Sequence, residues 1–344
     1  MGFVWPDEFC CFMGGNVIYN TYGIVEFEVR RLAGKTNKNG LIELFRFLCS
    51  VWVAYFHGFF PVLSDQFNGV NTAVGFFFVL SGYFFLKSME KYRERPLGEG
   101  IVFIFWGRTK RFIVPLIIAA LSILYCNIAF PWELNGFNWP FSFLWFFAAQ
   151  FVFLSLFFLV YRKTKRQLVF NLFCVVVICI SMSAFRVLTK EFDRVARGPA
   201  MVAIGMLLSQ VPKLEIRGRD GRRMEKWTVF INAVGFVAAA ALYIYLAYLP
   251  GYEIWKLHLL GGFAGPAVLY FATALPVHSK ILDFLGEFSV FIYLAQCPIL
   301  LHHYYVSRDT REQFPLLCIC AVLLFALNRI LNKKKVVEKI TAKK

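Results

Sequence analysis

The chain has 344 residues, of which 59% are hydrophobic and 17% charged, and its formal net charge is +16 at pH 7. Soluble domains average roughly 45–50% apolar and about 25% charged residues, so this composition excludes an ordinary soluble protein and indicates a polytopic membrane protein, all-α in fold class. The charge does not indicate nucleic-acid binding, because the long apolar segments leave no folded soluble domain to present a basic face.

Residues 1–38 precede the first long apolar segment. Asp7 and Glu8 stand where a secretory signal would be basic or apolar, and no small-residue cleavage site follows an apolar core. We therefore expect a lead-in that is disordered or lies at the membrane interface, with Met13 as an alternative start.

Ten apolar segments follow, and most reach the roughly 17 to 25 residues that a helix needs to cross a bilayer. The sixth is the weakest, because it is short and contains Pro199 and Gly205, so we expect a broken or tilted helix there. The ten predicted spans are residues 41–60, 69–86, 112–130, 141–160, 168–185, 198–211, 227–249, 257–275, 286–305 and 314–331.

The basic residues predict how these spans are oriented, because Lys and Arg accumulate in short cytoplasmic loops. With the N-terminus inside, 29 of the 37 Lys and Arg residues fall in cytoplasmic segments, one of which is the loop 87–111, and seven fall outside. The reverse orientation would invert this bias. We therefore predict a ten-span bundle over residues 39–332 with both termini cytoplasmic, ending in a basic tail at 333–344.

Glycines at helical spacing predict where helices approach closely, because small residues let two backbones come together. Gly75 and Gly82 are seven residues apart, and Gly261 and Gly265 are four apart. We expect both pairs to lie at helix contacts.

Arg46 and His57 lie on the first predicted span, eleven positions apart. On an α-helix that spacing is about three turns plus 20°, so both side chains leave the same face, roughly 16 Å apart along the axis. Ionisable groups inside a span cost free energy and commonly mark a functional path. Purely structural roles for the two residues stay open as alternatives. Arg46 could extend its side chain to the cytoplasmic headgroups, and His57 could cap the outer end of the helix.

Four blocks of sequence form a recognisable series. They are residues 42–46 (IELFR) with His57 after ten intervening residues, 77–83 (FFVLSGY), 108–111 (RTKR) with Pro115, and 284–298 (FLGEFSVFIYLAQCP). In order and spacing they resemble the acyltransferase-3 family of integral membrane O-acyltransferases, and Arg197 with residues 205–208 is a fainter similarity. The chain departs from the family at Val290 and Gln296, where Tyr and His are common, and at Gly75, where many members carry Asp.

The resemblance implies transfer of an acyl group, most often acetyl, from cytoplasmic acyl-CoA to a hydroxyl of a cell-surface carbohydrate or related envelope acceptor. His57 and Arg46 would be catalytic. His57 would act as general base, which suits a reference pKa of about 6.5, or would carry the acyl group itself. Arg108 and Arg111 would bind the phosphates of the donor, although the positive-inside rule alone also explains them.

Three further side chains are candidates for support, namely Ser81, Tyr293 and Gln296. The Ser81 hydroxyl could stabilise an oxyanion or could bond only within its own helix, and we favour the second. We expect no metal and no bound cofactor, with acyl-CoA as the co-substrate. The expected partners are membrane lipid, acyl-CoA, a carbohydrate or glycolipid acceptor and polysaccharide-synthesis proteins, but no nucleic acid.

Two other functions stay open at this point. A transporter or flippase of a glycan precursor could use Arg46 and His57 on a substrate or proton path. Transporters often consist of two similar halves, but the second half of this chain contains no counterpart of the pair. The second is that the protein is a structural or regulatory membrane component that has lost activity. Only Gln296, which stands where the family commonly has histidine, favours this hypothesis.

Overall fold

The computed structural model describes most of the chain from Asn39 onward. The described ranges are 39–58, 69–110, 113–129, 145–164, 166–187, 193–217, 224–248, 259–305 and 310–341. The predicted lead-in at residues 1–38 lies outside them.

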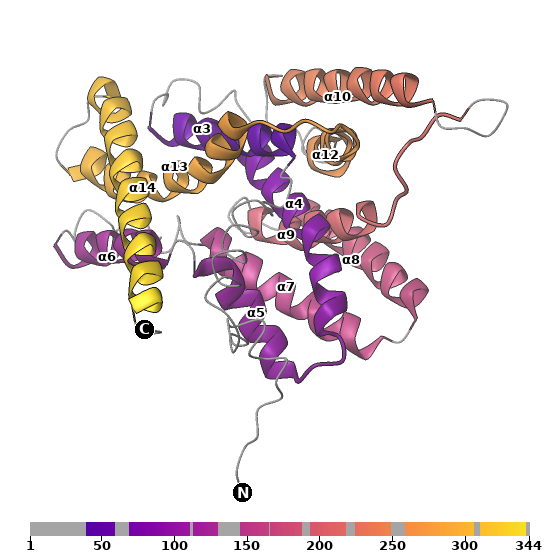
Figure 1. Cartoon of the computed structure of the whole chain (residues 1–344), viewed down its shortest axis with the longest axis horizontal. Helices are drawn as coiled ribbons and strands as arrows, with labels where there is room; N and C mark the ends of the chain where they lie inside the picture. The colour runs from indigo at the N-terminus through magenta and orange to yellow at the C-terminus, as the bar shows by residue number, and fades with distance from the viewer. Residues whose placement is uncertain are drawn as a thin grey trace, which may run out of the picture. The chain divides into compact units, whose positions relative to one another are not determined.

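Helices make up nearly all of the described ranges, which contain no strand, and each predicted span corresponds to helical structure (Figure 1). The all-α fold class is therefore confirmed. The helices are α3 (Gly40–Gly58), α4 (Gly69–Tyr92), α5 (Leu97–Thr109), α6 (Ile113–Ala129), α7 (Trp145–Lys163), α8 (Gln167–Val187), α9 (Asp193–Leu208), α10 (Glu225–Tyr248), the π-helix η2 (Leu260–Ala264), α12 (Gly265–Ala274), α13 (Lys280–Tyr305) and α14 (Thr310–Thr341).

A broken helix, one of the two alternatives expected for the sixth predicted span, is wrong. Helix α9 continues without interruption from Asp193 to Leu208 and contains Pro199 as its seventh residue, where the missing N–H costs one backbone hydrogen bond without ending the helix. The irregularity lies instead in the eighth span, where five residues of π-helix precede α12.

Helix α5 was not expected, because residues 87–111 were assigned to a single cytoplasmic loop. A Cβ on Gly100 of α5 would overlap the ring of Phe158 on α7, and the Phe105 ring lies 5.4 Å from that of Phe151. Residue numbers rise on α5 as they fall on α7, so the two helices are antiparallel. The C-terminal residues of α5 therefore lie beside the first half of α7.

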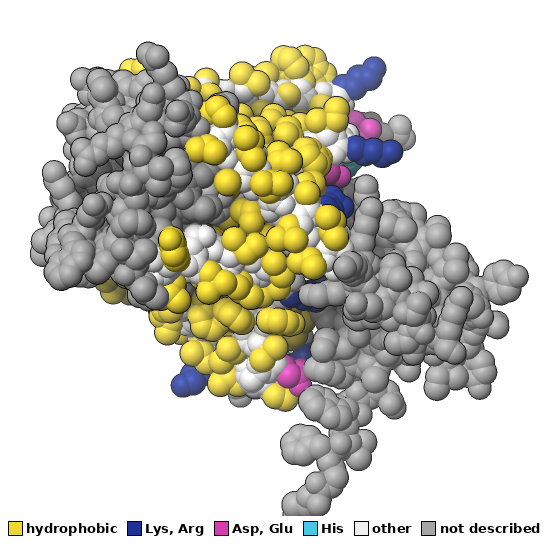
Figure 2. All heavy atoms as spheres, turned by 90° about the vertical axis from the view of Figure 1, so that its left-hand side faces the viewer, with side chains coloured by type: hydrophobic (Ala, Val, Ile, Leu, Met, Phe, Trp, Pro, Cys, Tyr) yellow, Lys and Arg dark blue, Asp and Glu magenta, His cyan; other side chains and the backbone are white. Residues whose placement is uncertain are grey.

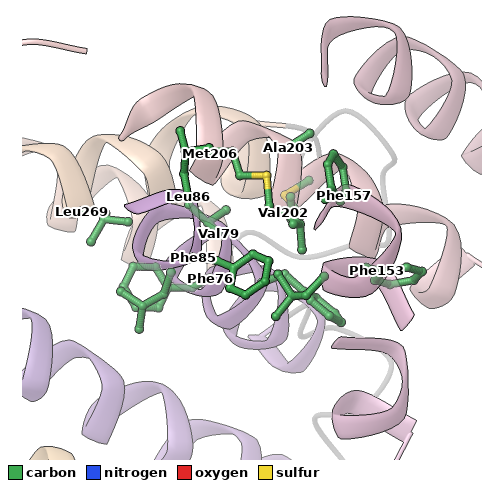
Figure 3. Packing of buried hydrophobic residues seen from close by; sticks show 14 of the residues in the cluster. Phe76, Val79, Phe85, Leu86, Phe153, Phe157, Val202, Ala203, Met206 and Leu269 are labelled. Atoms are coloured by element: carbon green, nitrogen blue, oxygen red, sulfur yellow. The ribbon is translucent and has the colours of Figure 1, made fainter. Parts of the chain in front are cut away.

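Aromatic and aliphatic side chains of α4, α7 and α9 form the centre of the larger hydrophobic core (Figure 3). The core side chains Phe76, Phe85 and Met206 are 0–1% exposed, and Figure 3 shows them interdigitating with Phe153 and Val202. A buried aromatic core of this density fixes the depth at which each helix sits relative to its neighbours.

Two glycines allow α4 and α9 to pack with their backbones in contact. A Cβ on Gly82 would overlap the backbone of Val202, and a Cβ on Gly205 would overlap the backbone of Val79. The expectation of close packing is therefore correct for Gly82. It is wrong for Gly75, where an added Cβ would meet no atom of the described residues within 4 Å, because Gly75 lies one turn before Val79, outside this crossing.

Much of the described surface is apolar, as expected for a protein surrounded by lipid. On the face in Figure 2, hydrophobic side chains predominate and the Lys and Arg side chains lie near its margins. Among the described residues, four helices are long and apolar enough to cross a membrane, with windows at Phe146–Lys163, Gln167–Ala184, Glu225–Ala247 and Pro315–Asn332. Together with the composition, these features identify a membrane protein.

Asn39 fixes the beginning of α3. Its Oδ1 accepts hydrogen bonds from the backbone N–H groups of Leu41 (3.1 Å) and Ile42 (3.3 Å), which makes it the N-cap. Its Nδ2 donates to the carbonyl oxygens of Ala272 (2.7 Å) and Leu275 (2.8 Å) at the end of α12. One side chain therefore caps α3 and attaches it to a segment far away in the sequence.

Replacing Asn39 by alanine is expected to lower the free energy of unfolding by about 1–2 kcal/mol, because the cap and the attachment to α12 are both lost. Asn39→Asp keeps the accepting oxygen and loses the amide donor, so its stability is expected to lie between those of wild type and Asn39→Ala. Thermal unfolding of the detergent-solubilised protein measures the three midpoints. Equal midpoints would contradict this role.

Candidate functional site

Arg46 and His57 are carried by one unbroken helix, α3, as the sequence predicts. Eleven residues of regular α-helix bring both Cα atoms to one face, with about three turns between them. Arg46 lies in the second turn and His57 is the last residue but one. The His57 side chain lies outside the described part of the structure, so its role stays a prediction.

A carboxylate one turn before Arg46 pairs with it. The Arg46 Nη1 donates to both oxygens of Glu43, at 3.1 Å to Oε1 and 2.9 Å to Oε2. Glu43 as a whole residue is only 8% exposed. An arginine inside an apolar bundle is costly when its charge is uncompensated, and this ion pair supplies the compensation within the same helix.

Helix α13 packs along α3 and leaves room for this carboxylate. A Cβ on Gly40 would contact Leu282, and a Cβ on Gly286 would overlap the Glu43 side chain. Residue numbers rise together in these two contacts, so α3 and α13 run in the same direction. The start of the closing sequence block therefore lies beside the start of the opening one.

Each of these two helices carries a stripe of buried polar side chains. On α3 the stripe contains Glu43 and Ser50, and on α13 it contains Ser289 and Gln296, which are 1% and 3% exposed. Both pairs have a spacing of seven residues, or nearly two turns, which places each pair on one face of its helix. Ser289 and Gln296 donate to carbonyl groups of their own helix, those of Gly286 (2.7 Å) and Ile292 (3.4 Å).

Tyr293 lies between Ser289 and Gln296 in the sequence of α13 and contacts the beginning of α7. Its ring centroid is 6.1 Å from that of Phe146 and 5.7 Å from that of Phe147. Phe146 in turn contacts Phe77 at 6.1 Å and Phe78 at 4.8 Å on α4. The first turn of α7 therefore connects two sequence blocks that are more than 200 residues apart.

Ser81 is already engaged in hydrogen bonds. Its Oγ donates to the carbonyl oxygen of Phe77 at 2.7 Å and accepts a hydrogen bond from the Nε2 of Gln150 on α7. The expectation that Ser81 bonds within its own helix is confirmed. The single hydroxyl hydrogen is used within the helix in this arrangement, and a role of Ser81 towards an oxyanion stays a prediction.

Of the two arginines expected to bind the donor, the structure describes only the backbone of Arg108. Arg108 is the last residue but one of α5, and its backbone follows Phe105 towards the N-terminal half of α7. Its side chain and the whole of Arg111 lie outside the described part of the structure. Binding of the donor by these arginines stays a prediction.

A family model for acyltransferase domains, that of acyltransferase-3, matches residues 39–336 of the chain. The chain belongs to the acyltransferase-3 family. The resemblance carried by the four sequence blocks is thereby confirmed, and the protein is an acyltransferase. No curated protein and no solved structure matches the chain.

Within this acyltransferase-3 domain, three residues of the site were missed by sequence reasoning: Glu43, Phe146 and Gln150. Glu43 could have been found, because residues three apart on a helix are neighbours and an acid beside an arginine is a natural partner. Phe146 and Gln150 carry no such signal. Phenylalanine is the most abundant aromatic residue of the chain, at 41, and only the tertiary packing distinguishes this one.

Replacing Ser81 by alanine is expected to leave acyl transfer within about threefold of wild type, because the hydroxyl bonds to its own helix and its loss leaves the packing intact. The rate is measured at matched protein abundance. A loss of a hundredfold or more, which is the scale of an oxyanion donor, would show that Ser81 acts on the substrate. The matched control is Ser88→Ala, on the same helix and bonded to its own turn in the same way.

Proposed function

We propose that this acyltransferase is a multi-pass protein of the cell membrane that transfers an acyl group, with acetyl as the proposed group, from cytoplasmic acyl-CoA to a hydroxyl group of a cell-surface carbohydrate or related envelope acceptor. The observation that carries the proposal is the arrangement on α3. One face of a single helix bears an arginine held by a buried carboxylate and, three turns further, a histidine.

The proposed chemistry divides the reaction between these two residues. His57 removes the proton from the acceptor hydroxyl as its oxygen attacks the thioester carbonyl, and the thiol of coenzyme A then leaves. The positive charge of Arg46 attracts oxygen atoms of the donor, which extends along the helix towards His57. A covalent acyl-histidine is the competing route, and it also requires His57.

The donor carries phosphates and enters from the cytoplasm, so a cluster of guanidinium groups suits its binding. Arg108 and Arg111 are the proposed pair, and their spacing of three residues makes them neighbours if the helix continues through them. Tyr293 and Gln296 are proposed to line the route of the acyl group, since both lie on the face of α13 that carries the buried polar stripe.

Ten spans with both termini in the cytoplasm form the proposed topology. Three contacts between helix ends support it. Asn39 bonds to the end of α12, the Arg93 guanidinium donates to the Thr164 carbonyl oxygen at 2.6 Å, and the Lys213 ammonium donates to that of Thr273 at 2.6 Å. Each contact joins two ends that this topology assigns to the cytoplasmic side. The end of α5 differs, because it lies beside the first half of α7, which the topology assigns to the outer half of the span.

Metabolic labelling tests the proposal. Cells with and without the gene are fed labelled acetate, and base-labile label on surface glycans is measured, with labelled succinate in parallel. Label that requires the gene supports O-acylation, and the label that is incorporated identifies the acyl group. Gene-dependent movement of a glycan precursor without covalent label would instead favour transport.

A further inference from the structure

Glu43 is a buried acid on a helix that otherwise presents mostly apolar side chains to its neighbours. Its side chain is 10% exposed, whereas that of Arg46 is 31% exposed. The two partners are therefore unequal: the carboxylate is enclosed by protein, and the guanidinium extends from it towards more open space. Both hydrogen bonds use Nη1 of Arg46, so the pairing itself does not occupy Nη2 or Nε.

Gly286 on α13 encloses the carboxylate from the other side. A Cβ at this position would overlap Oε2 and would lie 2.6 Å from both Cβ and Cδ of Glu43. Any larger residue would displace the carboxylate or separate the helices. The position of the negative charge is therefore set by the packing of α3 on α13, independently of its bond to Arg46.

We infer that Glu43, enclosed against Gly286, is a positioning residue that fixes the guanidinium of Arg46 for the reaction. A charged hydrogen bond to a fixed partner restricts a long side chain to one orientation. Displacements of about 1 Å at a reacting centre can lower rates by a hundredfold. The catalytic part of this inference rests on the proposed function, whereas the restraint on Arg46 does not.

The restraint is tested first, without reference to the reaction. The full-length protein in detergent is treated with phenylglyoxal, which modifies accessible arginines, and mass spectrometry follows the modification of Arg46. Glu43→Gln and Gly286→Ala are each expected to raise its rate at least about threefold, because the guanidinium loses its strongest partner. Unchanged rates in both variants would overturn the inference.

Two matched controls accompany these variants. Glu287→Gln removes the acid next to Gly286, whose ion pair with Arg329 (2.8 Å) is at the surface. Gly98→Ala adds a Cβ where no atom lies within 4 Å. Both controls are expected to leave the modification rate of Arg46 at the wild-type value.

Turnover is tested second, with labelled acetyl-CoA and membranes that contain the acceptor. Glu43→Gln and Gly286→Ala are expected to lower kcat about tenfold to a hundredfold, with a smaller change in the KM for the donor, and Glu43→Asp to recover part of the rate. The double variant is expected to lose no more than the worse single variant, because both act on one contact. Additive losses, or wild-type kcat per folded molecule, would overturn the inference.

The two proposals fail in different ways. Absence of gene-dependent acyl transfer by the wild type would contradict the proposed function, and the modification rates would still decide whether Glu43 restrains Arg46. Acyl transfer by the wild type with unchanged rates in the Glu43 and Gly286 variants would contradict the positioning role alone.

Discussion

His57→Ala is expected to lower gene-dependent acyl transfer by about 10²–10⁴-fold, the range typical for the loss of a general base. The variant is compared with wild type at matched abundance in the membrane, with base-labile label on surface glycans as the measurement. His278→Ala is the matched control, since this residue lies between α12 and α13, beside the start of α3 and therefore at the opposite end of that helix from His57. Equal label in His57→Ala and wild type would exclude a catalytic histidine at this position.

The same variant distinguishes the two possible mechanisms. Added imidazole is expected to restore part of the rate if His57 acts as a base, because a diffusible base replaces the missing ring. In the acyl-histidine route, wild-type protein quenched during turnover carries label on the chain itself, at His57. Label on His57 together with a lack of imidazole rescue would indicate that His57 acts as a covalent catalyst and not as a general base.

Gly205→Ala is expected to reduce the free energy of unfolding by about 2–3 kcal/mol, near the upper end of the range for overpacking. The added Cβ would meet the backbone of Val79 and Tyr83, and backbone, unlike a flexible side chain, cannot move without shifting a whole helix. Thermal unfolding in detergent and the yield of monodisperse protein measure the effect.

Gly75→Ala provides the control of opposite sign. It lies on α4, the helix that Gly205 contacts, but its Cβ would meet no atom within 4 Å, so alanine is expected to stabilise the helix by up to about 1 kcal/mol. Similar midpoints for Gly205→Ala and Gly75→Ala would show that the contact between α4 and α9 is looser than described.

The sequence predicted the helices better than it predicted their contacts. Apolar length and helical spacing are local properties, so they located the helices and placed Arg46 and His57 on one helix. Gly75 and Gly82 illustrate the limit: their spacing places them on one helical face, yet only Gly82 lies where α9 crosses. Where two helices cross depends on all the side chains between them, which no local pattern contains.

Helix α5 was missed for a related reason. Its apolar stretch, Leu97–Trp106, is ten residues long and lies between basic clusters, so it is too short to count as a span and resembles part of a charged loop. Its packing against Phe151 and Phe158 of α7 provides the stability that a short helix lacks by itself. The Arg46–Glu43 pair, in contrast, was predictable from spacing alone.

The attachment of Asn39 to Ala272 and Leu275 has a consequence during biosynthesis. The helix that bears Arg46 and His57 is synthesised before the other described helices, but the carbonyl groups that its N-cap residue binds are made more than 230 residues later. Gly286, against which Glu43 packs, is made later still. At a synthesis rate of about 5–20 residues per second, α3 therefore waits for tens of seconds before these partners exist, although α4, whose Phe76 packs on Phe45, follows it directly. The surroundings of Glu43 are complete only when most of the chain has been made.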